Sequence, residues 1–270
     1  MTLEKDRWII LRKVDYGESG VIATVFSRAH GRMAVMANGA RKPKSPYKGL
    51  FDPGCMVEGV AYVKSSRGVQ TAKEVSIWVD TYALRSKMEG LALVSSVMEL
   101  VGQLIHDGEQ NEALFTTTAN YLSWLSSQSS TDRLFHSFAA FQCRVAEVLG
   151  FGIQPMDPEQ WQEYLAQQNL DQQNLAQQNL ESGSTQPIYL TIEDGSLTTQ
   201  AVGVSSLSLS PMEASLIQSV AQGKGAAALE DSSRPPSEWM QLIHHLDRYL
   251  GYHVGGLKPR KSDALWFFDS

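Results

Sequence analysis

The sequence predicts an α+β protein, in which a small five-stranded β-barrel precedes a mainly α-helical domain that carries a small β-hairpin. Three observations support this prediction. Residues 1–80 contain short β-branched and aromatic segments bounded by Gly, Pro or Asp. From about residue 81 the period at which apolar residues recur changes from two residues, as in strands, to roughly three and a half residues, as in helices. Net charge also differs in sign between the two parts, so we expect domains at 1–80 and 81–270.

The five expected strands lie at 8–14, 21–26, 32–36, 57–63 and 69–77. Short turn-forming segments separate antiparallel neighbours, whereas residues 38–54 form one long connection. This number and spacing of strands fit a Greek-key barrel of the OB type, which commonly binds nucleic acid on an open sheet face. An SH3-like barrel is the alternative fold.

Three helices are expected after the barrel. Apolar residues from Leu84 to Ile105 mark one face of a long helix that ends near Gly108, where glycine suits a helix C-terminus. A second helix is indicated between residues 114 and 125, and a third runs from 134 to 148. The Met and aromatic residues on these faces indicate a packed helical core.

Residues 165–182 contain three copies of Gln-Gln-Asn-Leu at a five-residue period, which builds no apolar stripe. This pattern predicts a low-complexity, mobile insertion at about 165–186. Beyond it, segments 188–192 and 197–202 flank an Asp-Gly turn that is typical of a hairpin. Ser210-Pro-Met-Glu then predicts the start of a helix, and a last helix begins near Pro236.

Beyond that helix, a short basic tail begins at Lys258. It could make a second phosphate contact, but we interpret it as a solvated terminus.

Composition is that of a globular protein, with 43% hydrophobic and 19% charged residues. The charged N-terminus does not resemble a signal peptide, and no apolar run reaches the ~18 residues of a membrane span. We therefore expect a cytoplasmic protein. Cys55 and Cys143 have no partners at ligand spacing, which predicts buried thiols, no disulfide framework and no metal site.

Charge is separated along the chain. Residues 1–80 hold 13 Lys+Arg against 8 Asp+Glu, whereas residues 81–270 carry a net charge of −11. Segment 28–48 contains six cations and no carboxylate, which indicates a site for a polyanion such as nucleic acid. The expected phosphate contacts are Arg28, Arg32, Arg41, Lys42, Lys44 and Lys48, with Arg12, Lys13 and Arg67 as secondary candidates.

Trp8 and Tyr62 are candidates for stacking on bases, with the barrel core as the alternative position for both. Motifs for catalysis are missing from the sequence. Gly223-Lys-Gly lacks the spacing of a phosphate-binding loop, and there is no dinucleotide-binding, nucleophile-elbow or zinc-protease motif. We therefore expect a binding protein without enzymatic activity or cofactor.

Several segments resemble the RecO family of bacterial recombination mediators. The similarity lies at Trp8–Ser19, Thr24–Arg32 and Ala37–Ser45, and then at Met98–Val101, Leu149–Gly152, Leu209–Pro211 and Arg248–Gly255. The resemblance implies an OB-fold domain and a role in DNA repair by the RecF pathway. It also implies binding of single- and double-stranded DNA, annealing of complementary strands, and work with RecR and the single-strand-binding protein SSB to load the recombinase RecA.

The chain departs from the family pattern at one place. Many members carry four zinc-binding cysteines after the segment that matches Leu149–Gly152, whereas this chain has none there, so we expect no metal. The acidic and apolar SSB tail requires an apolar pocket with a basic rim, for which Arg133 and Arg144 are candidates. An OB-fold RNA-binding protein and a protein-interaction scaffold are the alternative functions.

Overall fold

A computed structural model describes residues 2–64, 66–129, 134–178, 186–202, 205–225 and 236–267. The chain divides into two compact units, Met1–Arg133 together with Lys258–Ser270, and Leu134–Leu257. In this division the barrel lies in the same unit as the helices that directly follow it. Within the described residues, no helix is both long enough and apolar enough to cross a membrane.

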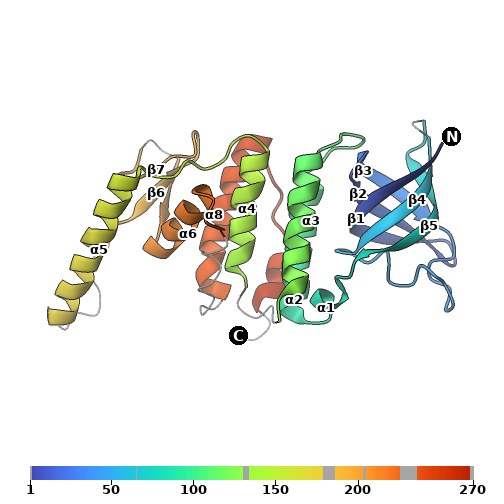
Figure 1. The fold of residues 1–270 in the computed structure, drawn as a ribbon, viewed down its shortest axis with the longest axis horizontal. Helices are drawn as coiled ribbons and strands as arrows, with labels where there is room; N and C mark the ends of the chain where they lie inside the picture. Colours follow the sequence, from blue (N-terminus) through green and yellow to red (C-terminus); the bar gives the residue numbers. More distant parts are fainter. Residues whose placement is uncertain are drawn as a thin grey trace. The chain divides into compact units, whose positions relative to one another are not determined.

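Five strands form a closed barrel in the first unit (Figure 1): β1 (Thr2–Tyr16), β2 (Gly20–Ser27), β3 (Gly31–Ala37), β4 (Met56–Val63) and β5 (Val69–Val79). Their order around the barrel is β1-β2-β3-β5-β4, and β4 closes the ring by pairing with β1. All neighbours are antiparallel except β3 and β5. This topology confirms the expected five-stranded barrel of the OB type.

Alternate residues of the strands fill the barrel interior. Trp8 and Ile10 of β1 point inward and pack with Val25 of β2 and Val57 of β4. Gly59 leaves room for the indole, since a Cβ atom there would lie 2.0 Å from the Trp8 ring. A large aromatic residue packed against a glycine of the neighbouring strand therefore sets the packing of the core.

Helices α1 (Tyr82–Arg85), α2 (Met88–Leu104) and α3 (Glu112–Ser127) follow the barrel. The Asn111 side chain accepts a hydrogen bond from Leu114 N and caps α3. Phe115 of α3 packs edge-to-face on Phe26 and stacks on Trp78, with ring centroids 5.2 and 6.1 Å apart. One part of the outer barrel face is thereby covered by helix.

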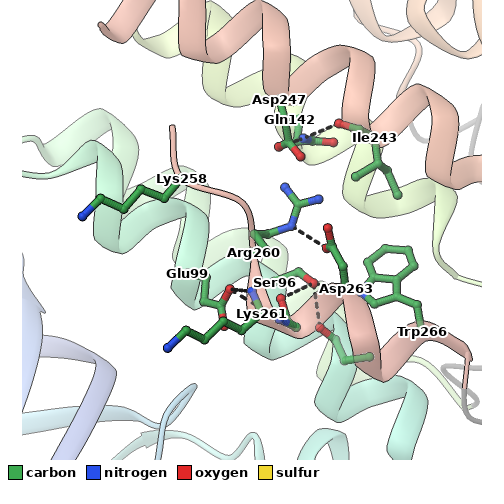
Figure 2. Close-up of polar contacts among 12 residues, drawn as sticks. Ser96, Glu99, Gln142, Ile243, Asp247, Lys258, Arg260, Lys261, Asp263 and Trp266 are labelled. Carbon is green, nitrogen blue, oxygen red and sulfur yellow. Dashed lines mark hydrogen bonds and ion pairs between the residues drawn. The ribbon is translucent and has the colours of Figure 1, made fainter. Parts of the chain in front are cut away.

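The C-terminal segment returns to this unit as the short 3-10 helix η1 (Lys261–Phe267), which packs on α2 (Figure 2). Trp266 is buried and donates from Nε1 to Ser96 Oγ over 3.0 Å. The Glu99 carboxylate accepts from the backbone N–H of Lys261 over 2.7 Å. The interpretation of this tail as a solvated terminus is wrong, because Arg260, Ser262 and Trp266 are buried and η1 packs on α2.

The second unit contains α4 (His136–Val148), α5 (Pro158–Gln178), β6 (Ile188–Thr191), β7 (Leu197–Thr198), β8 (Ser206–Leu209), α6 (Pro211–Ala221) and α8 (Pro236–Val254). The expected hairpin is confirmed as β6 and β7, and β8 adds a third strand that the sequence did not predict. Ser210 and Glu213 form the expected capping box. Gln142 links α4 to α8 by donating to Ile243 O over 3.2 Å and to Asp247 Oδ1 over 2.7 Å (Figure 2).

Helix α5 differs from the sequence prediction, because the glutamine-rich repeat is helical as far as Gln178. Its N-terminal part is anchored by Trp161 and Tyr164, which are buried and stack on each other. Leu170 is exposed, as expected for a five-residue period that builds no apolar stripe. Residues 179–185 of the predicted insertion lie outside the described residues.

Candidate nucleic-acid interface

Residues 38–54 form a compact lid over one end of the barrel. Consecutive turns are closed by backbone hydrogen bonds, such as those from Lys42 N to Gly39 O and from Ser45 N to Lys42 O, over 3.1 and 2.9 Å. Ala40 and Phe51 insert into the barrel core. The Tyr47 hydroxyl donates to Lys73 O over 2.6 Å and ties the lid to β5. This connection is therefore a packed part of the barrel, so side chains on it have defined positions.

Three lysines of this lid point into solvent. Lys42, Lys44 and Lys48 are exposed, and among the described residues none of their ammonium groups forms an ion pair or a side-chain hydrogen bond. Pro43 and Pro46 alternate with them and restrict the backbone. We call these three residues the lid lysines. They are a preformed group of cations that an anion can approach from solvent.

Arg41 has a different role from its lysine neighbours. Its guanidinium donates to the Asp15 carboxylate over 2.8 Å, and to the carbonyl oxygens of Gly17 and Glu18 over 2.7 and 2.9 Å. The backbone N–H of Arg41 also donates to Ser19 O over 2.9 Å. Arg41 therefore fastens the lid to the turn between β1 and β2.

Arg28 and Arg32 are also paired within the molecule. Arg28 donates from Nε to Glu112 Oε1 over 3.0 Å, and this hydrogen bond raises the pKa of the guanidinium above its usual value. Arg32 donates from Nε to Asp107 Oδ1 over 2.6 Å. Both carboxylates lie at or before α3, so these two arginines connect the barrel to the helices that follow it.

The secondary candidates lie on different parts of the barrel surface. Arg12 is exposed and donates to Thr24 Oγ1 over 3.2 Å, which holds its guanidinium on the outer face of β1 and β2. Lys13 forms an ion pair with Asp52 of the lid. Arg67 is exposed in the connection between β4 and β5.

The two aromatic candidates differ in exposure. Trp8 is only 1% exposed and lies inside the barrel, so the prediction that it stacks on bases is wrong. The inward alternation of β1 places it beside Gly59, where the indole is needed as core. Tyr62 lies opposite Leu3 on the outer face and is half-buried, so its stacking role stays a prediction.

Tyr16 is an exposed aromatic residue that sequence reasoning missed. The expected strand ended at Val14, whereas β1 continues to Tyr16. Alternation along the strand could have indicated this extension, because Arg12, Val14 and Tyr16 occupy every second position. All three side chains lie on the outer face of the barrel.

The candidates for partner binding are Arg133 and Arg144. Arg133 lies outside the described residues. Arg144 is exposed on α4 and forms an ion pair with Glu147. Burial raises the pKa of the Cys143 thiol to about 12, which disfavours the thiolate that a metal requires.

Residues 153–160 contain no Cys or His, so their donor set does not fit a zinc site. This segment is instead held by the Gln218 side chain, which hydrogen-bonds the Met156 N–H and C=O over 2.8 and 3.0 Å. Throughout the described part of the chain, no three His, Cys, Asp or Glu side chains are grouped so that they could hold a metal.

The strand order and the lid place the chain in the class of α+β proteins with an N-terminal OB-type barrel. Comparison with known families agrees with this class and refines it. Family models described as Recombination protein O N terminal and Recombination protein O C terminal match residues 1–79 and 85–156. The chain belongs to the RecO family of DNA repair and recombination proteins.

Curated relatives support this assignment. A DNA repair protein RecO from Pelodictyon phaeoclathratiforme is 25% identical over 268 residues, which cover 96% of this chain and 95% of the relative. Proteins of the same name from Salinibacter ruber and Pelotomaculum thermopropionicum are 30% and 34% identical, over 55% and 56% of this chain. These two alignments cover 56% and 57% of the relatives' own lengths.

Proposed function

We propose that this protein is a DNA-binding recombination mediator, which anneals complementary strands and helps to load a recombinase onto SSB-coated single-stranded DNA. The observation that carries the proposal is the group of lid lysines, held on a rigid loop with no carboxylate partner among the described residues. Membership of the RecO family supports a role in repair and recombination.

The proposed mechanism depends on electrostatics and involves no covalent chemistry. Two DNA strands repel each other, and cationic side chains placed between or beside them reduce that repulsion. Release of counterions from the phosphates supplies affinity that does not depend on sequence. A cationic lid with a fixed backbone suits this task, because little loop ordering is required on binding. We accordingly propose that the protein is not an enzyme.

Family membership also suggests the partners. We propose that the chain works with RecR and contacts the C-terminal tail of SSB, in the cytoplasm and in association with the nucleoid. Arg144 is exposed on α4, where its ion pair with Glu147 would have to open to receive an acidic tail. To test this contact, an SSB tail peptide would be titrated against the wild-type protein and against Arg144→Ala. The same titrations would be repeated with a peptide that lacks the terminal apolar residue.

The lid lysines can be tested directly. Changing Lys42, Lys44 and Lys48 together to Gln should weaken binding of single- and double-stranded DNA, whatever the sequence. If each lysine meets one phosphate, the slope of log affinity against log salt concentration for a single strand should become shallower by about 2. Fluorescence anisotropy at several salt concentrations measures both quantities, and an annealing assay should show a slower reaction.

A matched control removes the same charge elsewhere. Lys5, Lys87 and Lys224 are exposed and lie outside the lid, so changing all three to Gln should have a smaller effect. Equal losses in the two triple variants would show that only net charge matters and would contradict a specific site. A preference for RNA over DNA of the same sequence would instead favour the alternative of an RNA-binding protein.

A further inference from the structure

The outer face of β1 and β2 changes character along its length. At one end, Ile9 and Phe26 are paired across the strands and fully buried, and Phe115 of α3 packs on Phe26. At the other end, Val14 and Tyr16 are 50% and 53% exposed. The outer sheet face is therefore buried where a helix covers it. Beyond the helix the same face is still apolar but is exposed to solvent.

The pairing of the strands explains why Tyr16 is uncovered. Tyr16 lies directly opposite Gly20 of β2, which has no side chain to pack over the ring. A Cβ atom built at Gly20 would lie 3.7 Å from Tyr16 Cδ1, so the ring lies beside this glycine. Among the described residues, Tyr16 makes no aromatic ring contact. Its ring is available to a planar ligand.

A strip of apolar side chains continues from Tyr16 across the sheet. Val14 is paired with Ile22 of β2, which is paired in turn with Met36 of β3. Both Ile22 and Met36 are only partly buried. We call Tyr16, Val14, Ile22 and Met36 the open strip. It provides a partly exposed apolar surface against which flat rings can lie.

Cations flank the open strip. The contacts of Arg41 with Gly17 and Glu18 place the start of the lid, including Lys42, beside the turn that follows Tyr16. Arg12 lies on the same face, two positions beyond Val14, and is held by Thr24. The side chains of Glu18 and Asp15 are exposed at this end of the strip, and the Asp15 carboxylate is paired with Arg41, which leaves Glu18, among the described residues, as the unpaired negative group that a phosphate would meet. Aromatic surface bordered by cations suits nucleotides, which combine a flat base with a phosphate.

We propose that Tyr16 stacks on an unpaired base of single-stranded DNA, while Lys42 and Arg12 take phosphates on either side of the open strip. This inference rests on the proposed DNA-binding function and adds a contact that distinguishes strands. In a duplex the faces of the bases are already stacked and cannot reach the ring. The lid lysines therefore serve both kinds of DNA, whereas Tyr16 serves only unpaired strands.

The test compares Tyr16→Ala with Tyr16→Phe, which keeps the aromatic face. Stacking on an aromatic residue corresponds to roughly 5- to 150-fold in affinity per base. Tyr16→Ala should therefore bind a single-stranded oligonucleotide at least several-fold more weakly, while Tyr16→Phe stays close to wild type. Both variants should bind a duplex of the same length as wild type does. Tyr82→Ala, which removes a ring that is 70% exposed on α1, is the control.

A strand of abasic sites isolates the stacking contribution, because it keeps the sugar-phosphate chain without bases. Wild type and Tyr16→Ala should bind this strand equally. The assignment of Tyr16 would be overturned if Tyr16→Ala lost as much affinity for the duplex or the abasic strand as for the single strand. It would also be overturned if the substitution weakened binding of RNA alone. If wild type binds DNA and Tyr16→Ala binds single strands unchanged, only this inference fails. If wild type binds no DNA at all, the proposed function itself fails.

Discussion

The guanidinium of Arg41 donates to the carboxylate of Asp15 over 2.8 Å and joins the lid to the end of β1. The next residue, Lys42, is exposed and has no such partner among the described residues. Two adjacent cations in one basic segment therefore have different roles. Arg41 contributes to the barrel structure, and Lys42 is available for an external anion.

Separate substitutions of these neighbours should distinguish the two roles. Arg41→Gln removes the ion pair and the hydrogen bonds to the turn, and should lower the free energy of unfolding by about 1–2 kcal/mol. Lys42→Gln should leave stability unchanged and weaken DNA binding. Thermal unfolding and anisotropy titrations measure the two effects. A loss of stability in Lys42→Gln alone would reverse the assignment.

Gly59 is required by the indole of Trp8. Gly59→Ala would place a methyl group about where the ring now lies, since the built Cβ is 2.0 Å from it. We expect a destabilisation of about 1–3 kcal/mol or more, measured by chemical unfolding. Gly68→Ala is the control, because nothing lies within 4 Å of a Cβ atom at that position. Equal stability of the two variants would show that the barrel core can rearrange to accommodate the added methyl group.

The stability of the folded protein should depend on pH through the Glu213 carboxyl. Burial raises the pKa of its carboxyl above the usual 4.5, although Ser210 hydrogen-bonds it. A raised pKa means that the folded state binds the proton more tightly than the unfolded state does. This contribution to stability is present below about pH 4.5 and is lost as pH rises through the folded pKa.

Glu213→Gln cannot titrate and should lack this part of the pH dependence. The difference in unfolding free energy between wild type and Glu213→Gln should therefore move in favour of the variant as pH rises from 4 to 7. Urea unfolding at several pH values measures this difference. A constant difference across the range would show that the carboxyl titrates alike in both states.

The C-terminal segment should stabilise the first unit. Trp266 is buried against α2 and hydrogen-bonded to Ser96, so Trp266→Ala should cost about 3–5 kcal/mol. Lys261→Ala, which changes an exposed side chain on the same 3-10 helix, should have little effect. Thermal unfolding of the full-length protein compares the two. A small effect of Trp266→Ala would mean that this segment is dispensable for the fold.

Much of the architecture could be predicted from local patterns. Residue alternation and turn chemistry located all five strands, and the spacing of apolar residues located the helices that form the core of each unit. The capping box at Ser210 was predicted correctly because its contacts are local in sequence. The C-terminal tail was misinterpreted, because nothing within a few residues of Trp266 indicates that its partner is Ser96.

The sequence by itself determined the barrel, the helical composition and the presence of a cationic segment at 28–48, because these depend on residue types and spacings within short windows. Only the tertiary structure decided which cations are available. Arg28, Arg32 and Arg41 are paired with Glu112, Asp107 and Asp15, while the lid lysines are not paired among the described residues. These ion pairs join residues 26 to 84 positions apart in the chain, so the fold had to bring them together before the charges could be assigned.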